Sequence, residues 1–264
     1  FTYSFPVVQS GIYWYHSHTE LQEQSGVYGQ IVIDPVQYDG PSFDREYVIT
    51  LSDHSEESPS KIMRNLKRDS DYYNNGRLTI ADLFKDASKQ GWKKTFEDRR
   101  MWGGMRMTQT DISDVTGATY TFLMNGLSPD ENWSAVFNTG DRVRLRFINS
   151  AAMTYLDLRI PGLKMTVIQA DGNDVFPVEV DELRIAVAET YDVIVEPQEG
   201  RAYAIFAETL DRSGYARGTL APREGMTAEL PELRERPRLT MFDMRGAMPS
   251  HDDHSVAMDH ASMD

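Results

Sequence analysis

Alternating apolar and polar residues predict that most of this chain is β-structure. In residues 142–147, Val143, Leu145 and Phe147 would share one face of an extended strand, while three arginines would share the other. Residues 45–51 alternate in the same way, and Asn125-Gly126 is a hairpin signal after an apolar run. Further strands, separated by Gly, Pro and Asp, are expected near 155–160, 164–169, 183–187, 191–196 and 202–208. Many short strands at this spacing predict an all-β sandwich.

The pattern divides the chain into three parts. Residues 1–36 predict three strands, at about 1–8, 12–18 and 27–34, which would be the end of a first sandwich. Residues 42–222 would form a second sandwich. Residues 223–264 contain Pro231, Pro237 and many charged residues, and we expect a flexible linker or tail there.

Residues 58–107 interrupt the β pattern with helical signals. Ser58-Pro59 suits a helix start, and Thr79 with Asp82 resembles a capping box. A stripe of four residues at helical spacing ends before Gly91 and comprises Ile80, Leu83, Phe84 and Ala87. Two or three short helices inserted in the second sandwich are therefore predicted.

Composition narrows the possible functions. The 264 residues include 41 acidic and 27 basic side chains, a net charge of -14, which argues against nucleic-acid binding and favours attraction of cations. No apolar run is long enough to cross a membrane. The chain begins with Phe1 inside an expected strand, so we expect a fragment or a processed piece. The sequence has no cysteine, which excludes disulfides, thiol catalysis and thiolate metal sites.

The most informative motif is His16-Ser17-His18 at the end of an aromatic strand. Residues i and i+2 of a strand share a face, so the two imidazoles would lie side by side and each could bind one ion of a metal pair. Copper, zinc, iron and nickel all suit imidazole. The alternative is two histidines that make ordinary hydrogen bonds on a half-buried strand.

The residues around this motif resemble the multicopper oxidase family. The end of a first cupredoxin domain is matched by Gly11-Ile12-Tyr13-Trp14-Tyr15-His16-Ser17-His18 and by residues 22–33, and a second domain by residues 140–149 and 188–195. Residues 160–167 and 211–220 are most similar to the CopA-type copper-resistance oxidases. The resemblance covers nearly the whole chain and implies cupredoxin-like Greek-key β-sandwiches.

Several functional expectations come from this resemblance. His16 and His18 would each bind one of two type 3 coppers in a periplasmic, exported oxidase. That enzyme would oxidise Cu(I), or phenols, and reduce O2 to water by four electrons. The family's blue copper needs a His-Cys-His motif, which this sequence lacks. We therefore expect the chain alone to be inactive and to need the remaining cupredoxin domains as partners. The competing hypotheses are a non-catalytic copper-binding or storage protein and, more weakly, a structural sandwich without metal.

Two methionine-rich segments bear on copper. In the last 24 residues, five of the 13 methionines and three of the six histidines alternate with aspartates. A low-specificity copper-binding tail is expected there, against the alternative of a solvated linker. Its candidate ligands are Met241, Met244, Met248, His251, His254, Met258, His260 and Met263. Met101, Met105 and Met107 adjoin Trp102, and we expect core packing for them, with a copper role as the open alternative.

Overall fold

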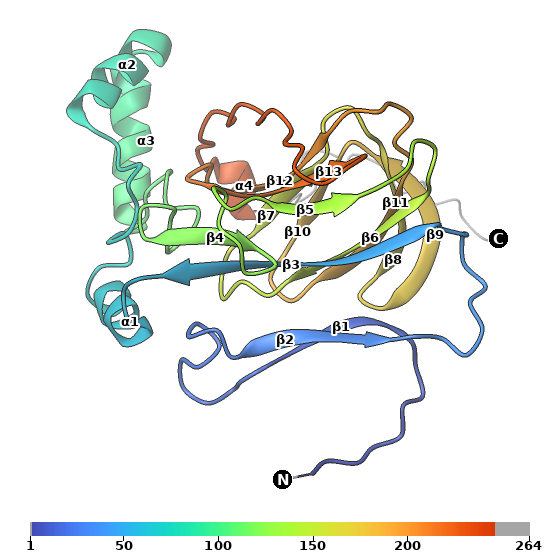
Figure 1. The fold of residues 1–264 in the computed structure, drawn as a ribbon. Helices are drawn as coiled ribbons and strands as arrows, with labels where there is room; N and C mark the ends of the chain where they lie inside the picture. Colours follow the sequence, from blue (N-terminus) through green and yellow to red (C-terminus); the bar gives the residue numbers. More distant parts are fainter. Residues whose placement is uncertain (1, 246–264) are drawn as a thin grey trace, which may run out of the picture.

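Two sheets packed face to face form the main body of the protein in a computed structural model, which describes residues 2–245 (Figure 1). The strands of these sheets are β3 (Arg45–Ser55), β4 (Tyr120–Met124), β5 (Trp133–Val136), β6 (Val143–Asn149), β7 (Leu156–Arg159), β8 (Met165–Ala170), β9 (Asn173–Val180), β10 (Glu182–Ile185), β11 (Thr190–Val195), β12 (Tyr203–Thr209) and β13 (Tyr215–Ala221). One sheet has the order β4-β3-β6-β11-β8-β9 and the other β10-β7-β12-β13-β5. The predicted all-β sandwich is confirmed. Among residues 2–245, no helix is long and apolar enough to cross a membrane.

The core lies between the two sheets, as the alternation in β6 predicted. Val143, Leu145 and Phe147 are completely buried and belong to one continuous apolar cluster. Arg144 and Arg146 lie on the opposite face of the strand, yet they are also buried. Both guanidinium groups pair with the buried carboxylate of Asp192 on β11, and this pairing offsets the cost of taking the charges out of water.

A separate two-stranded sheet, β1 (Gly11–His16) with β2 (Tyr28–Ile33), lies against the outer face of the six-stranded sheet (Figure 1). Ile12 is fully buried there, and its carbonyl accepts a hydrogen bond from the Thr190 hydroxyl at 3.2 Å. The Gln30 side-chain amide donates to the Thr50 hydroxyl at 2.7 Å. The prediction of a strand at about 1–8 is wrong, because residues 2–10 pair with no described strand.

Three helices lie between β3 and β4, as predicted for residues 58–107. They are α1 (Pro59–Arg68), α2 (Ile80–Gln90) and α3 (Trp92–Gly104). The Thr79 capping box is present, and Gly91 takes a positive φ of 86° between α2 and α3. Ser58 precedes α1 with Pro59 in its first turn, but the serine side chain makes no capping hydrogen bond.

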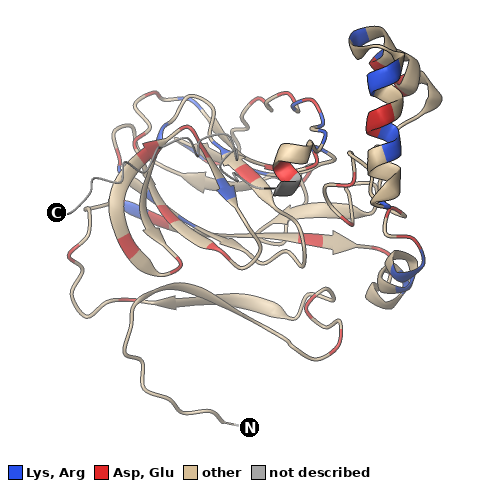
Figure 2. Cartoon of the chain, turned by 180° about the vertical axis from the view of Figure 1, so that it is seen from behind, with Lys and Arg blue, Asp and Glu red and all other residues tan. Residues whose placement is uncertain are grey.

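The helical hairpin α2–α3 projects from the sandwich and carries charges of both signs (Figure 2). The apolar stripe predicted on α2 is therefore only partly covered. Ala87 is buried, whereas Ile80 is 75% exposed and Phe84 is 58% exposed. Phe84 packs edge-on against Trp92 of α3, with ring centroids 5.4 Å apart, so the hairpin covers part of its own apolar surface.

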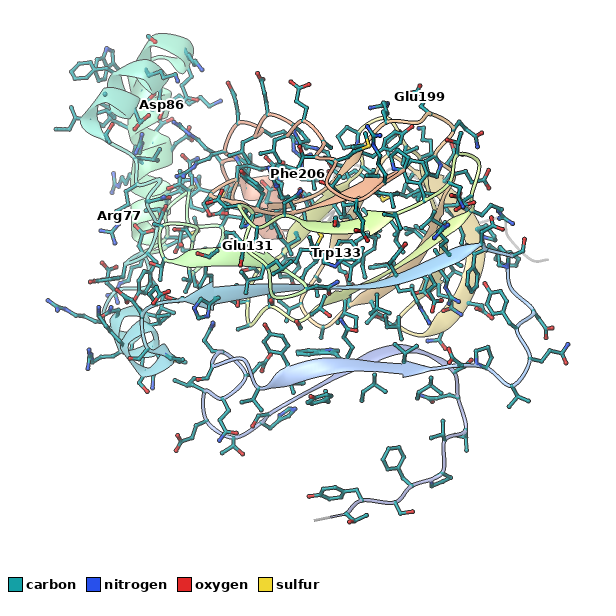
Figure 3. All side chains as sticks on the ribbon, in the orientation of Figure 1. Arg77, Asp86, Glu131, Trp133, Glu199 and Phe206 are labelled. Carbon is teal, nitrogen blue, oxygen red and sulfur yellow. The ribbon has the colours of Figure 1, made fainter. Side chains whose placement is uncertain are left out.

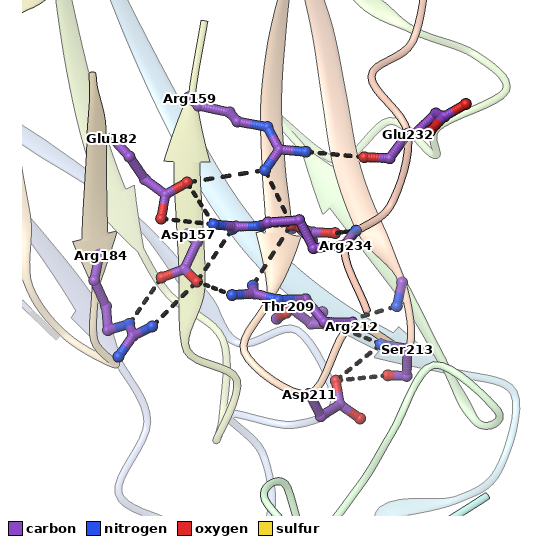
Figure 4. Close-up of polar contacts among 12 residues, drawn as sticks. Asp157, Arg159, Glu182, Arg184, Thr209, Asp211, Arg212, Ser213, Glu232 and Arg234 are labelled. Atoms are coloured by element: carbon purple, nitrogen blue, oxygen red, sulfur yellow. Dashed lines mark hydrogen bonds and ion pairs between the residues drawn. The ribbon is translucent and has the colours of Figure 1, made fainter. Parts of the chain in front are cut away.

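Residues 232–240, which we call the strap, run along the body without helix or strand and lead into the short helix α4 (Met241–Arg245). Arg234 anchors the strap to the five-stranded sheet (Figure 4). Its guanidinium group lies 2.7 Å from Glu208, 2.8 Å from Glu182 and 3.3 Å from Asp157. Glu208 and Asp157 are buried. These contacts give the strap a fixed course along the body. A flexible linker or tail was expected for residues 223–264, so residues 232–240 differ from that expectation.

Candidate metal centre

The strand β1 and the turn that follows it position both histidines of the predicted site. The antiparallel register places His16 opposite Tyr28, and the Ser17 amide adds a hydrogen bond to the Val27 carbonyl at 3.1 Å. The Ser17 hydroxyl donates to Gln22 at 2.7 Å. These bonds hold the chain extended past the end of β1, and His18 follows at the start of the turn.

The structure brings the two imidazoles together. The ring centroids of His16 and His18 lie 4.6 Å apart, and their planes are tilted by 40°. The indole of Trp14 stacks on the other face of His16, at 4.2 Å and 12°. Trp14 and His16 share the face of β1 on which Ile12 is buried against the second sandwich, whereas His18 is exposed. The arrangement is a row of three rings, supported at the Trp14 end and open at the His18 end.

The buried ring nitrogen of His16 tests whether a metal ion fits this arrangement. Nδ1 lies 3.0 Å from a carboxylate oxygen of Glu23, but the geometry is not that of a hydrogen bond, and the atom has no hydrogen-bond partner among the described residues. A carboxylate beside one nitrogen commonly orients a metal-binding imidazole and increases the basicity of the other nitrogen. With Nδ1 directed at Glu23, Nε2 is left for a metal ion. These donors fit copper, because neutral imidazole is one of its usual ligands.

Two histidines are an incomplete centre. Within residues 2–245, no group of three or more His, Cys, Asp or Glu side chains is placed to hold a metal ion.

The turn after His18 also contacts the second sandwich. The Tyr120 hydroxyl donates to the Gln24 side chain at 2.5 Å, and Gln24 lies next to Glu23 in sequence. Close by, burial raises the pKa of Asp53, whose carboxylate accepts a 2.7 Å hydrogen bond from the Thr154 hydroxyl. Sequence reasoning missed Glu23 and Gln24, and their spacing of five to eight residues after His16 and His18 was the available signal.

The structure does not test the predicted copper ligands of the tail. Met241 begins α4 and is partly buried, and Met244 lies in the same short helix. The other candidates lie outside the described residues: Met248, His251, His254, Met258, His260 and Met263.

Comparison with known sequences identifies the class of protein that this fold and histidine pair belong to. A sequence model described as "Multicopper oxidase" matches residues 74–225, and another with the same description matches residues 1–37. The chain belongs to the multicopper oxidase family, whose cofactor is copper.

Within that family, the chain is similar to copper resistance protein A. It is 55% identical to that protein of Escherichia coli and 53% identical to that of Pseudomonas syringae pv. tomato, in each case over 100% of this chain. It covers 43% and 42% of those proteins, so the chain spans less than half the length of these relatives.

Solved structures of the family share the fold. Fet3p, a multicopper oxidase that functions in iron import, superimposes with a TM-score of 0.58 at 17% identity, over 86% of this chain and 37% of that one. A laccase from Botrytis aclada gives a TM-score of 0.58 at 22% identity, over 88% of this chain and 39% of that one. These likenesses confirm the predicted cupredoxin-like architecture.

Proposed function

We propose that this chain is part of an exported, periplasmic copper-resistance oxidase, in which His16 and His18 each bind one type 3 copper. The observation that carries the proposal is the imidazole pair, with ring centroids 4.6 Å apart and the buried Nδ1 of His16 beside Glu23. The 55% sequence identity to copper resistance protein A of Escherichia coli, which extends over the whole chain, supports the proposal. When bound, the copper ions would pass electrons taken from the substrate to O2, which is reduced to water.

The side chains of this chain would hold and shield such a centre. Trp14 stacks on His16 and limits both the rotation of the ring and the access of water from that side. Glu23 lies beside Nδ1, which leaves Nε2 as the nitrogen that His16 would offer to metal. Glu23 lies in the turn after His18. The hydrogen bond between Gln24 and Tyr120 attaches this turn to the second sandwich.

The remaining parts of the proposal concern the whole protein. The missing ligands would come from other cupredoxin domains of the same longer protein, because residues 2–245 hold no group of three or more candidate metal ligands. We propose Cu(I) as the substrate, with phenols as the alternative, and an additional copper-binding role for the tail from Met241 onward. The domain limits 1–36, 42–222 and 223–264 remain predictions. The chain alone should be colourless and inactive with copper, since it has no cysteine for a blue site.

Replacement of single histidines in the full-length protein tests the proposal. We expect His16→Ala or His18→Ala to abolish O2 consumption and to lower the bound copper, while the blue colour of the type 1 site remains. His54→Ala is the matched control, because His54 is exposed and its nearest carboxylate, on Glu56, is 3.9 Å away. Normal O2 consumption by His16→Ala would contradict the assignment.

A non-catalytic copper-binding or storage protein is the competing function. The methionines and histidines that alternate with aspartates in the last 24 residues favour it. The same assay decides between the two. A copper-loaded full-length protein that consumes no O2 with Cu(I) as electron donor supports storage, whereas catalytic turnover excludes it.

A further inference from the structure

Methionine side chains outside the main core lie in two different settings. Met101, Met105 and Met107, at the end of α3 and just after it, are 38%, 37% and 37% exposed, so the core packing that we expected for them from the sequence is wrong. Met63 on α1 and Met153 before β7, by contrast, line a cavity of about 230 Å³. This cavity lies between α1, the turn that follows β1 and the second sandwich.

Three separate parts of the chain enclose the cavity (Figure 3). The turn after β1 contributes Leu21, and the second sandwich contributes the ring of Tyr120. Four side chains of α1 complete the apolar wall, at the spacing i, i+3, i+4 and i+7 that forms one face of a helix: Pro59, Ile62, Met63 and Leu66. An apolar cavity of about 150 Å³ is large enough to hold benzene, so this one has room for a six-membered ring.

The walls of the cavity are fixed to the body of the protein. The Tyr120 hydroxyl donates to the Gln24 side chain at 2.5 Å and so connects two of the walls. On α1, the Asn65 side-chain amide donates to the hydroxyl of Tyr73, a buried residue of the core, at 2.8 Å. A cavity that is already formed costs a ligand little ordering of the protein when it binds.

The charged side chains around the cavity have a single sign. Glu20 and Glu23 line it, and the described lining includes no lysine, arginine or histidine. Glu20 is exposed, whereas the side chain of Glu23 is only 27% exposed and also lies 3.0 Å from Nδ1 of His16. Two carboxylates beside apolar surface attract a cation more strongly than they would in open water. The net charge of -14 adds to this attraction.

We propose that this cavity binds a small organic cation, with an apolar body between α1 and Tyr120 and an ammonium group at Glu20 and Glu23. The apolar walls cannot replace the water around an inorganic ion, and the two carboxylates repel an anion. A primary ammonium group attached to one aromatic ring satisfies both conditions. The site is independent of the proposed copper centre, because neither His16 nor His18 lines the cavity.

Fluorine NMR titration with three probes of similar shape tests the charge requirement. The probes are 4-fluorobenzylamine, which is a cation at pH 7, the neutral 4-fluorobenzyl alcohol and the anion 4-fluorobenzoate. The full-length protein is kept under argon with ascorbate, so that any copper it holds is Cu(I) and diamagnetic. We expect the amine to bind about tenfold more tightly than the alcohol, and the benzoate to bind most weakly. Equal affinity for the amine and the alcohol would overturn the proposal.

A substitution that fills the cavity tests where the amine binds. Met63→Trp places a large ring in the cavity and should weaken binding of 4-fluorobenzylamine at least about tenfold. Arg64→Trp is the matched control, because Arg64 is the next residue of α1, is exposed and does not line the cavity. Equal affinities of the two variants would mean that the amine binds elsewhere on the acidic surface, and this would overturn the site.

A second pair of variants removes one charge without changing the shape of the cavity. Glu20→Gln should weaken binding of the amine but not of the alcohol, whereas Glu56→Gln should change neither, because Glu56 is fully exposed and does not line the cavity. An equal loss of amine binding in both variants would indicate a general effect of net charge and would contradict recognition by Glu20. His16→Ala should keep the amine bound although it abolishes O2 consumption, so this proposal and the oxidase proposal fail separately.

Discussion

Arg234→Met should destabilise the protein, because Arg234 is the anchor of the strap. Its side chain contributes three ion pairs, to Glu208, Glu182 and Asp157. Removal of one partner from a fully buried pair costs about 3–5 kcal/mol of unfolding free energy. Here the two buried carboxylates keep other cations: Arg159 lies 3.2 Å from Glu208, and Arg212 contacts Asp157 at 2.6 Å.

We therefore expect a smaller loss of unfolding free energy, about 2 kcal/mol. In a protein of this size that loss corresponds to a decrease of about 4–8 °C in melting temperature. Because the lost contacts hold the strap, residues 232–240 should also become sensitive to protease before the rest of the chain unfolds.

Thermal unfolding by circular dichroism and limited proteolysis with mass mapping measure these two effects. Arg223→Met is the matched control, since Arg223 is an exposed arginine of the same C-terminal segment. Arg234→Lys should give an intermediate result, because it keeps the charge but loses the planar fork. The reasoning fails if Arg234→Met melts within error of Arg223→Met and its strap is cut no faster.

Two further predictions concern stability. Burial alone raises the pKa of Asp157, but Arg184 and Arg212 outweigh burial and hold the pKa below its ordinary value. The ion pairs of Asp157 with these arginines should therefore stabilise the folded protein fully above the ordinary aspartate pKa of about 3.9, and this stabilisation should be lost as the pH falls below it. As the pH is lowered through this range, the unfolding free energy of Asp157→Asn should fall less steeply than that of the unsubstituted protein. Equal slopes for the two proteins would contradict this reasoning. Gly172→Ala should cost more than Gly225→Ala, by about 1–3 kcal/mol, because both glycines have positive φ but only at Gly172 does a Cβ overlap the Tyr13 ring. Denaturant unfolding of the two variants compares them, and equal losses would show that Tyr13 moves aside without cost.

Local signals in the sequence correctly predicted features that depend on neighbouring residues. The alternation of Val143, Leu145 and Phe147 predicted a core strand, and Thr79 with Asp82 predicted the start of α2. The pairing of His16 with His18 followed from the two-residue period of a strand.

Features that depend on distant partners were missed. Arg234 seemed part of a charged linker, since Glu208 and Asp157 lie 26 and 77 residues away in the sequence. The strand β9 was not predicted, because its residues are mostly exposed and include Pro177. The exposure of Phe84 follows from the projection of the hairpin, which a helical stripe alone does not indicate.

The support of β1 and β2 by the second sandwich has a consequence for the order of folding. A two-stranded sheet is marginally stable by itself in water. In this chain the hydrogen bond that fixes Ile12 comes from Thr190, 178 residues further along. On a ribosome, Thr190 emerges long after His16 and His18 have left the exit tunnel, and contacts between such distant residues form slowly. We therefore expect the small sheet that carries the two imidazoles to become stable only after β11 has joined its own sheet.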